Sequence, residues 1–336
     1  MKIKTGGASV SLLDVAREAG VSRATASLVL RDSPLVAAAT REKVREAMMR
    51  LGYIYNRGAA NLRQKRTGTI GLVLSNIANP FFSALTAGVE QANDLSGSVC
   101  FIANSGESPE RQARQIQRLR EHNVDGLIVC PAIGSDNRLF EEIDRLGLPF
   151  VQVLREIPDT VRDYVTVDYA AGIDAALSHL RASGRKRVVY IGDMDVHSAA
   201  RARLSGYERA CAHLDLTPMP AIAGTRDSQY DEAAFDRLLD STSPPDSAIC
   251  YNDIIALAVM THLRRRGLEA GQDFSVIGMD DIPAAGAAYP TLTTIATMPT
   301  RIGFAAARLL EKRIARPTRR VEREVIAPEF VLRHSA

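Results

Sequence analysis

Apolar residues between positions 11 and 52 recur at the three- and four-residue spacing of amphipathic helices. Ser11 and Asp14 form the Ser-x-x-Asp pattern of a capping box, and Gly20 supplies the left-handed residue that can end a first short helix. Two further helices are predicted, from Arg23 to about Arg31 behind a Ser22 cap and from Thr40 to Gly52. The pattern therefore predicts a small three-helix unit whose first two helices are joined by a Gly-containing turn.

Two short helices joined in this way form a helix-turn-helix, which places its second helix in the major groove of DNA. On that helix Ala26, Val29 and Leu30 form one apolar face, and Arg23, Ala24, Ser27 and Leu28 are left facing outward. The candidate DNA-contacting residues of this unit are Ser22, Arg23, Ala24, Thr25, Ser27, Leu28 and Arg31.

Residues 53–63 are rich in small and basic residues and carry one apolar residue, Leu62, where a solvated linker would have a polar one. A helix of small residues can approach a partner backbone closely, and its leucine can enter a base step of the minor groove as a wedge. A plain linker helix is the alternative; the position directly after a helix-turn-helix favours the wedge. The candidate contacts here are Asn56, Arg57, Ala59 and Leu62.

From Thr69 onward short apolar runs alternate with helical stretches, which predicts parallel strands covered by helices on both faces. The predicted strands fall in two groups, at 70–74, 99–103, 126–130 and 150–154, and then at 188–192, 248–251 and 274–278. Two groups imply two similar lobes, each a doubly wound parallel sheet. Helices are expected at 82–95, 111–122, 169–183, 202–214 and 254–267.

Ligands of such sheets bind beyond the carboxyl ends of the strands. Amides, an arginine, carboxylates and aromatic rings follow the predicted strands, and this mixture suits a polyhydroxylated ligand, since rings stack on apolar sugar faces and charged groups hold hydroxyls. The candidate ligand-binding residues are Asn76, Asn79, Phe82, Asn104, Arg155 and Asp253. Phe81 is expected in the core, and Asp280 and Asp281 are expected to organise a turn or a contact between the lobes.

The ordered motifs of the chain resemble the LacI/GalR family of bacterial transcriptional regulators. The resemblance rests on Asp14 to Ser22, Ala24 to Ser27, Thr40 to Val44, Leu51-Gly52-Tyr53, Asn79 to Phe82, Val124-Asp125-Gly126, Arg155, Val167-Asp168, Arg203-Leu204-x-Gly206-Tyr207, Asn252-Asp253 and Gly278 to Ile282. It implies a helix-turn-helix domain at 9–55, a hinge helix and linker at 56–66, and a type I periplasmic-binding-protein-like effector domain at 67–336. The N-lobe would comprise 67–167 and about 297–325, and the C-lobe 168–296 and about 326–336.

The resemblance further implies a homodimeric repressor of a carbohydrate-use operon that a small-molecule effector releases from a pseudo-palindromic operator in double-stranded DNA. A corepressor-dependent regulator with a purine or nucleoside effector, or a sugar-binding receptor without a regulatory role, are the alternatives. The family commonly has Arg at the position of Leu28 and a capping Ser at that of Ala37, so other residues would carry more of the base reading, and the third helix would begin at Thr40. No leucine heptad follows Val331, which favours a dimer over a tetramer.

Charge and composition agree with a DNA-binding head. The whole chain has a net charge of +3, but residues 1–66 hold 13 Lys and Arg against 5 Asp and Glu, a net of +8, and the remainder is therefore at −5. The four cysteines lack metal-binding spacing, nucleotide-binding and catalytic motifs are missing, and neither a signal peptide nor a membrane span is evident. We therefore expect a cytoplasmic protein without cofactor, metal or enzymatic activity.

Overall fold

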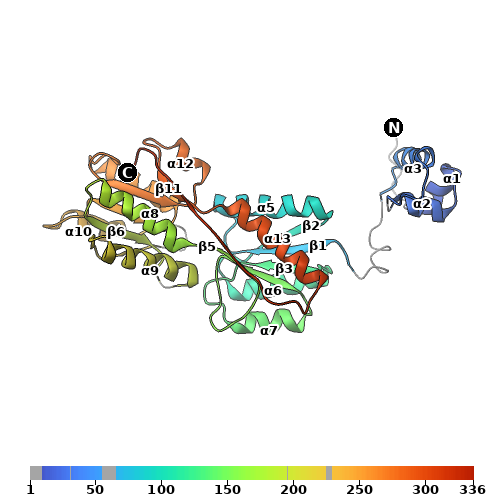
Figure 1. The fold of residues 1–336 in the computed structure, drawn as a ribbon, viewed down its shortest axis with the longest axis horizontal. Coiled ribbons are helices and arrows are strands. Elements are labelled where there is room, and N and C mark those ends of the chain that lie inside the picture. Colours follow the sequence, from blue (N-terminus) through green and yellow to red (C-terminus); the bar gives the residue numbers. More distant parts are fainter. Residues whose placement is uncertain (1–9, 31, 55–65, 195, 225–228) are drawn as a thin grey trace, which may run out of the picture. The chain divides into compact units, whose positions relative to one another are not determined.

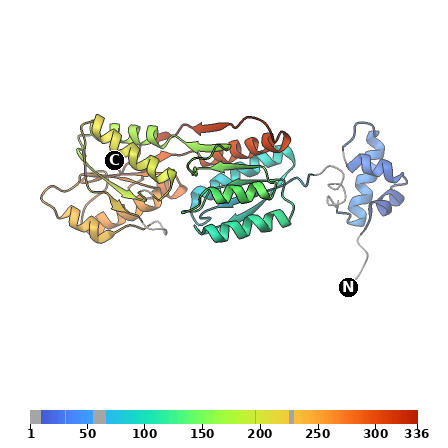
Figure 2. The ribbon, with the colours of Figure 1, turned by 90° about the horizontal axis from the view of Figure 1, so that it is seen from below.

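The computed structural model describes residues 10–30, 32–54, 66–194, 196–224 and 229–336. The chain forms two compact units, Met1–Thr67 and Gly68–Ala336. Figures 1 and 2 show the elements of both units.

The first unit contains the three predicted helices. They are α1 (Leu12–Glu18), α2 (Arg23–Leu30) and α3 (Ala38–Leu51). The Ser11 side chain accepts a hydrogen bond from the Asp14 backbone, and the Asp14 carboxylate accepts one from the Ser11 backbone, which confirms the capping box. Val15, Ala26 and Val44 are among the buried residues at the centre of the unit.

Two expectations for this unit need correction. Helix α3 begins at Ala38 rather than Thr40, although its N-cap residue, Ala37, makes no side-chain capping bond; packing of Val44 and Ala47 into the core holds it instead. Leu28 was expected to face outward with Arg23, but it is half-buried and packs against the core of the unit.

The second unit is built on two sheets, which confirms the predicted α/β class. Its strands are β1 (Thr69–Leu74), β2 (Val99–Asn104), β3 (Gly126–Val129), β4 (Phe150–Val153), β5 (Tyr164–Val167), β6 (Arg187–Gly192), β7 (Thr217–Pro218), β8 (Ile222–Ala223), β9 (Ser247–Cys250), β10 (Ser275–Met279), β11 (Thr293–Ala296), β12 (Arg323–Ile326) and β13 (Glu329–Val331). Its helices are α5 (Pro80–Ser96), α6 (Pro109–Glu121), α7 (Asn137–Arg145), α8 (Tyr169–Ala182), α9 (Ser198–His213), α10 (Glu232–Leu239), α11 (Asp253–Arg265), α12 (Pro283–Ala287) and α13 (Pro299–Ala315).

One sheet defines the N-lobe, with the order β12-β5-β4-β3-β1-β2 and parallel pairing throughout. The other defines the C-lobe, with the order β13-β11-β10-β9-β6-β7; β8 also pairs with β6, and β13 is antiparallel to β11. The chain passes from one lobe to the other after β5, after β11 and after β12, as Figure 2 shows. Three crossover segments therefore join the two lobes and border the space between them.

Helices α5 and α13 pack against each other over the N-lobe sheet (Figure 1). The approach is close enough to require glycine on both helices. A Cβ on Gly88 would lie 2.0 Å from the Thr300 carbonyl oxygen, and a Cβ on Gly303 would lie 1.9 Å from that of Leu85. Small residues therefore fix the position of α13, from which the chain returns into β12.

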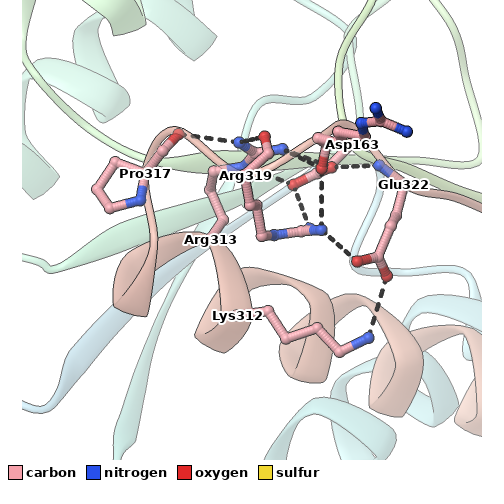
Figure 3. Close-up of polar contacts among 7 residues, drawn as sticks. Asp163, Lys312, Arg313, Pro317, Arg319 and Glu322 are labelled. Carbon is pink, nitrogen blue, oxygen red and sulfur yellow. Dashed lines mark hydrogen bonds and ion pairs between the residues drawn. The ribbon is translucent and has the colours of Figure 1, made fainter.

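A buried carboxylate holds the turn between α13 and β12 (Figure 3). The Asp163 side chain is fully buried and accepts hydrogen bonds from Arg313 at 2.8 and 2.9 Å and from Arg319 at 2.8 Å. It also accepts one from the Glu322 backbone at 2.8 Å. Asp163 precedes β5, so this cluster ties two neighbouring strands at the same edge of the N-lobe sheet.

Within the described residues no helix combines the length and the hydropathy needed to cross a membrane. The four cysteines are unpaired, and Cys130, Cys211 and Cys250 are buried.

Candidate effector cavity and DNA-reading helix

A cavity lies between the two lobes at the carboxyl ends of their strands, as the arrangement of parallel strands predicts. Its lining is formed by Ser75, Asn76, Asn79, Phe81, Phe82, Glu107, Leu154, Arg155, Tyr169, Asp193, Ala199, Arg203, Tyr251, Asn252, Ile255 and Asp280. Aromatic rings, amides and charged groups thus meet in one site, which can both stack on a ligand and form hydrogen bonds with it.

The segment after β1 supplies the amides and two rings of the N-lobe side. Asn79 caps α5 by accepting a hydrogen bond from the Phe81 backbone at 3.0 Å, and Asn76 accepts one from Ala78 at 3.1 Å. The rings of Phe81 and Phe82 meet edge to face with their centroids 5.2 Å apart. Phe81 is buried in the core as expected, and both rings also line the cavity.

Arg155 and Glu107 form a buried ion pair on the same side. The two terminal nitrogens of Arg155 donate to the two carboxylate oxygens of Glu107 at 2.7 and 2.8 Å, and one of them also donates to the Pro131 carbonyl at 3.0 Å. Burial alone would raise the pKa of Glu107, but the hydrogen bonds and charge of Arg155 outweigh it and lower that pKa. Glu107 is therefore ionised at neutral pH.

Arg203 is the cation of the C-lobe side. Its guanidinium carbon lies 3.8 Å from the ring centroid of Tyr169 and 4.4 Å from that of Tyr251, so that two aromatic rings hold it. Its Nε lies 3.0 Å from the Met279 sulfur, and a terminal nitrogen donates to the Ala199 carbonyl at 3.1 Å. Arg203 is thus fixed in a buried position on the cavity wall.

Two aspartates of the C-lobe complete the charged lining. Burial raises the pKa of Asp193, and it raises that of Asp280 to about 7, although Arg203 opposes both shifts. His197 lies behind the wall, with Nε2 3.3 Å from the Tyr251 hydroxyl. Burial and the charge of Arg155 lower the pKa of His197 to about 2, so the ring is neutral.

Helix α2 of the first unit presents polar residues at its start. The Ser22 hydroxyl accepts a hydrogen bond from the Thr25 backbone at 3.0 Å, which starts the helix one residue after the turn. Arg23 and Ala24 are exposed, whereas Thr25 and Ser27 are half-buried. Arg31, Asn56, Arg57, Ala59 and Leu62 lie outside the described residues.

Residues 11–56 match the family model for bacterial regulatory proteins of the lacI family, and residues 177–336 match the model for a periplasmic binding protein-like domain. The regulator GalR from Salmonella typhimurium strain LT2 is 33% identical over 331 residues, which cover 97% of this chain and 95% of GalR. The chain belongs to the LacI/GalR family of bacterial transcriptional regulators.

Other members of the family show the same full-length similarity. The repressor PurR from Haemophilus influenzae strain PittEE is 30% identical over 97% of this chain and 98% of PurR. The structure of the regulator CelR in complex with cellobiose is 30% identical, covers 97% of this chain and 100% of that chain, and has a TM-score of 0.73. The Lac repressor dimer bound to operator and the anti-inducer ONPF is 25% identical, covers 98% and 99%, and has a TM-score of 0.83.

Membership of the LacI/GalR family makes the protein a DNA-binding transcriptional regulator with an effector-binding domain, and not an enzyme. The cavity is the candidate effector site of this regulator. Of the residues predicted for that role from the sequence, the structure brings together Asn76, Asn79, Phe82 and Arg155 in the lining.

Two residues predicted to bind the effector do not line the cavity. Asp253 is fully buried: one carboxylate oxygen accepts from the Ile282 backbone at 2.8 Å and the other accepts from the Thr294 hydroxyl at 2.5 Å. Asn104 accepts from the Ile77 backbone at 3.1 Å and so holds the segment after β1. Both follow or end strands as expected, but their side chains accept hydrogen bonds from the regulator's own fold, Asn104 from a backbone amide and Asp253 from a backbone amide and a hydroxyl.

Several lining residues were not among the predicted contacts. Arg203 and Asn252 belong to stretches that carry the family resemblance, and Tyr169, Asp193 and Asp280 directly follow or lie near strand ends, so the sequence held a signal for each. Glu107 had no such signal. It is placed by two successive left-handed residues, Gly106 and Glu107 with φ of 58° and 59°, which turn the chain back toward Arg155.

Proposed function

We propose that this regulator is a repressor of a carbohydrate-utilisation operon, released from its operator by a sugar or sugar-derived effector. The observation that carries the proposal is the cavity lining, in which the rings of Phe82, Tyr169 and Tyr251 stand beside amides and carboxylates. Rings match the apolar faces of a sugar, and amides and carboxylates match its hydroxyls. CelR, similar over the whole chain, has been solved with cellobiose.

A homodimer on a pseudo-palindromic operator is the assembly we propose. Strand β2 is the edge of the N-lobe sheet and exposes Val99, Phe101 and Ile102 at 51%, 44% and 44%. An apolar edge strand that remains open favours pairing with a second copy. The similar Lac repressor structure is a dimer bound to operator.

In each half of the dimer, α2 would read the major groove through Arg23, Ala24 and Ser27, with Ser22 and Thr25 fixing the start of the helix. Leu28 and Arg31 remain proposed contacts, although Leu28 can offer only the part of its side chain that the core leaves free. The hinge residues Asn56, Arg57, Ala59 and Leu62 would enter the minor groove between the two half-sites.

The proposal is tested with the full-length protein. An operator is selected from random duplex DNA, and its binding is then titrated with sugars, sugar acids and purines at fixed salt. A carbohydrate that weakens operator binding supports the proposal, and by linkage the operator must weaken binding of that carbohydrate by the same factor. If none of the carbohydrates changes operator binding, the proposal is wrong.

A corepressor-dependent regulator is the second candidate, favoured by the 30% identity to PurR over nearly the whole chain. The same titration separates the two, because a purine corepressor would strengthen operator binding where an inducing sugar would weaken it.

A further inference from the structure

The described lining of the effector cavity contains two arginines, and one of them, Arg155, is held by a carboxylate on the same wall. Arg155 gives both terminal nitrogens to Glu107, and the side chains of this pair are 11% and 12% exposed. A fork of two parallel hydrogen bonds is the geometry in which arginine would otherwise bind a ligand carboxylate. Glu107 therefore takes the place that the carboxylate of an acidic effector would occupy.

Glu107 is itself held in position, so the ion pair is a fixed part of the wall. Its Oε2 also accepts a hydrogen bond from the Ile133 backbone at 3.0 Å. Arg155 in turn donates a hydrogen bond to the carbonyl of Pro131, which lies in the same loop as Ile133. Breaking the pair would leave an uncompensated buried charge, which is costly, and an incoming anion would have to displace Glu107 to reach Arg155.

The charges of the rest of the described lining also disfavour an acidic effector. Arg203 is held between Tyr169 and Tyr251, and it lies in the field of Asp280. The described lining contains two cations, Arg155 and Arg203, and three carboxyl groups, Glu107, Asp193 and Asp280. An anionic effector would meet no surplus of positive charge here, whereas hydroxyl groups can donate to the carboxyl oxygens.

We propose that Glu107 is a specificity-determining residue that selects uncharged polyhydroxylated effectors over the corresponding acids by reserving Arg155 for itself. The inference rests on the proposed function, since it narrows the effector of the same cavity from sugars and sugar acids to uncharged sugars.

The first test uses full-length protein and matched ligand pairs: galactose with galacturonate, glucose with glucuronate, and cellobiose with cellobionate. Binding is measured by calorimetry for the wild type, for Glu107→Gln, and for Glu110→Gln, a control on the neighbouring exposed carboxylate of α6.

The neutral member of a pair is expected to bind the wild type and the control more tightly than its acid. In Glu107→Gln the ratio of acid to neutral affinity is expected to rise about ten- to hundredfold. A wild type that prefers the acid, or a ratio unchanged by Glu107→Gln, would overturn the inference.

The second test does not depend on identifying the effector. Acetate replaces chloride at constant ionic strength while the melting temperature of the full-length protein is followed. Glu107→Gln frees the Arg155 fork, so acetate is expected to raise its melting temperature in a saturable way. The double variant Glu107→Gln with Arg155→Gln keeps a neutral pair at the same place and is expected to show no such rise, like the wild type.

These outcomes separate the two proposals. Equal effects of acetate on the wild type and on Glu107→Gln would overturn the role of Glu107 even if a sugar controls operator binding. Suppose that no sugar binds and that only Glu107→Gln shows saturable acetate binding. The proposed carbohydrate effector would then be wrong, whereas the conclusion that Glu107 occupies the anion-binding nitrogens of Arg155 would be supported.

Discussion

The guanidinium of Arg203 stacks on the ring of Tyr169, with its central carbon 3.8 Å from the ring centroid. The negative face of an aromatic ring attracts a planar cation, so Arg203 can stay charged in a buried site without forming an ion pair. The arrangement places a rigid hydrogen-bond donor on the C-lobe wall of the cavity, opposite the Arg155–Glu107 pair of the N-lobe. The effector is thus expected to contact residues of both lobes.

Replacing Arg203 by lysine keeps the charge and removes the planar group. We expect the effector concentration that releases operator to rise about tenfold or more, because lysine can neither fill the space between two rings nor present the same donors. Operator binding without effector should persist. The measurement is an operator-release titration with the ligand found in the screen, beside Arg209→Lys, an exposed arginine of the same helix, as control. An unchanged release curve for Arg203→Lys would remove this residue from the effector site.

Asp253→Asn is expected to change the pH dependence of stability. Burial, with the nearby charge of Asp280 as a further cause, raises the pKa of Asp253 from 3.8 to about 8. The folded protein therefore retains a proton that the unfolded chain has lost between these pH values, and folding becomes less favourable as pH rises through this window, by up to about 1.4 kcal/mol per pH unit. Asparagine carries no such penalty, and its amide can still accept from Ile282 and donate to Thr294.

The measurement is urea unfolding of both proteins at several pH values. The free energy of unfolding of Asp253→Asn, relative to the wild type, should increase from pH 5 to pH 8 and then level off. Asp231→Asn, a change at the exposed cap of α10, serves as the control. Parallel pH profiles for the wild type and Asp253→Asn would contradict a protonated Asp253 in the folded protein.

Local signals in the sequence were sufficient for much of the fold. The capping box of Ser11 and Asp14 lies within one helical turn, so it could be recognised without knowing any distant contact. The buried strands β1, β3 and β9 consist mostly of apolar residues. Strand β12 was not predicted, because three of its four residues are exposed and it gains its place only by pairing with β5.

The candidate site was predictable in position but not in detail. The rule for strand ends predicted that Arg155 and Asn76 lie beside the cavity, because it depends only on topology. It could not tell that Asp253 and Asn104 accept hydrogen bonds from donors of the fold itself, since the direction of a side chain depends on which donors lie nearby. Glu107 was missed because its position depends on a loop conformation, with φ of 59°, that no local pattern indicated.

Asp163→Asn is expected to destabilise the effector domain by about 3 kcal/mol, because it leaves two arginines without the carboxylate that both contact (Figure 3). Thermal and urea unfolding of the full-length protein measure the loss. Asp144→Asn removes a more exposed pair with Arg162 and is expected to cost less than about 1 kcal/mol. Similar losses in the two variants would show that the cluster at the α13–β12 turn contributes no more than a surface ion pair.

Leu62→Ala tests the hinge. Residue 62 lies outside the described residues, so the expectation comes from the sequence: a leucine that wedges into a central base step contributes only where the DNA deforms to receive it. Affinity for the selected operator is expected to fall at least tenfold more than affinity for random duplex DNA.

The control is Arg63→Ala, the neighbouring change. It should instead weaken binding to both DNAs and reduce the slope of log affinity against log salt by about one unit. Fluorescence anisotropy with both DNAs at several salt concentrations measures the two effects, and equal losses on operator and random DNA for Leu62→Ala would exclude the wedge.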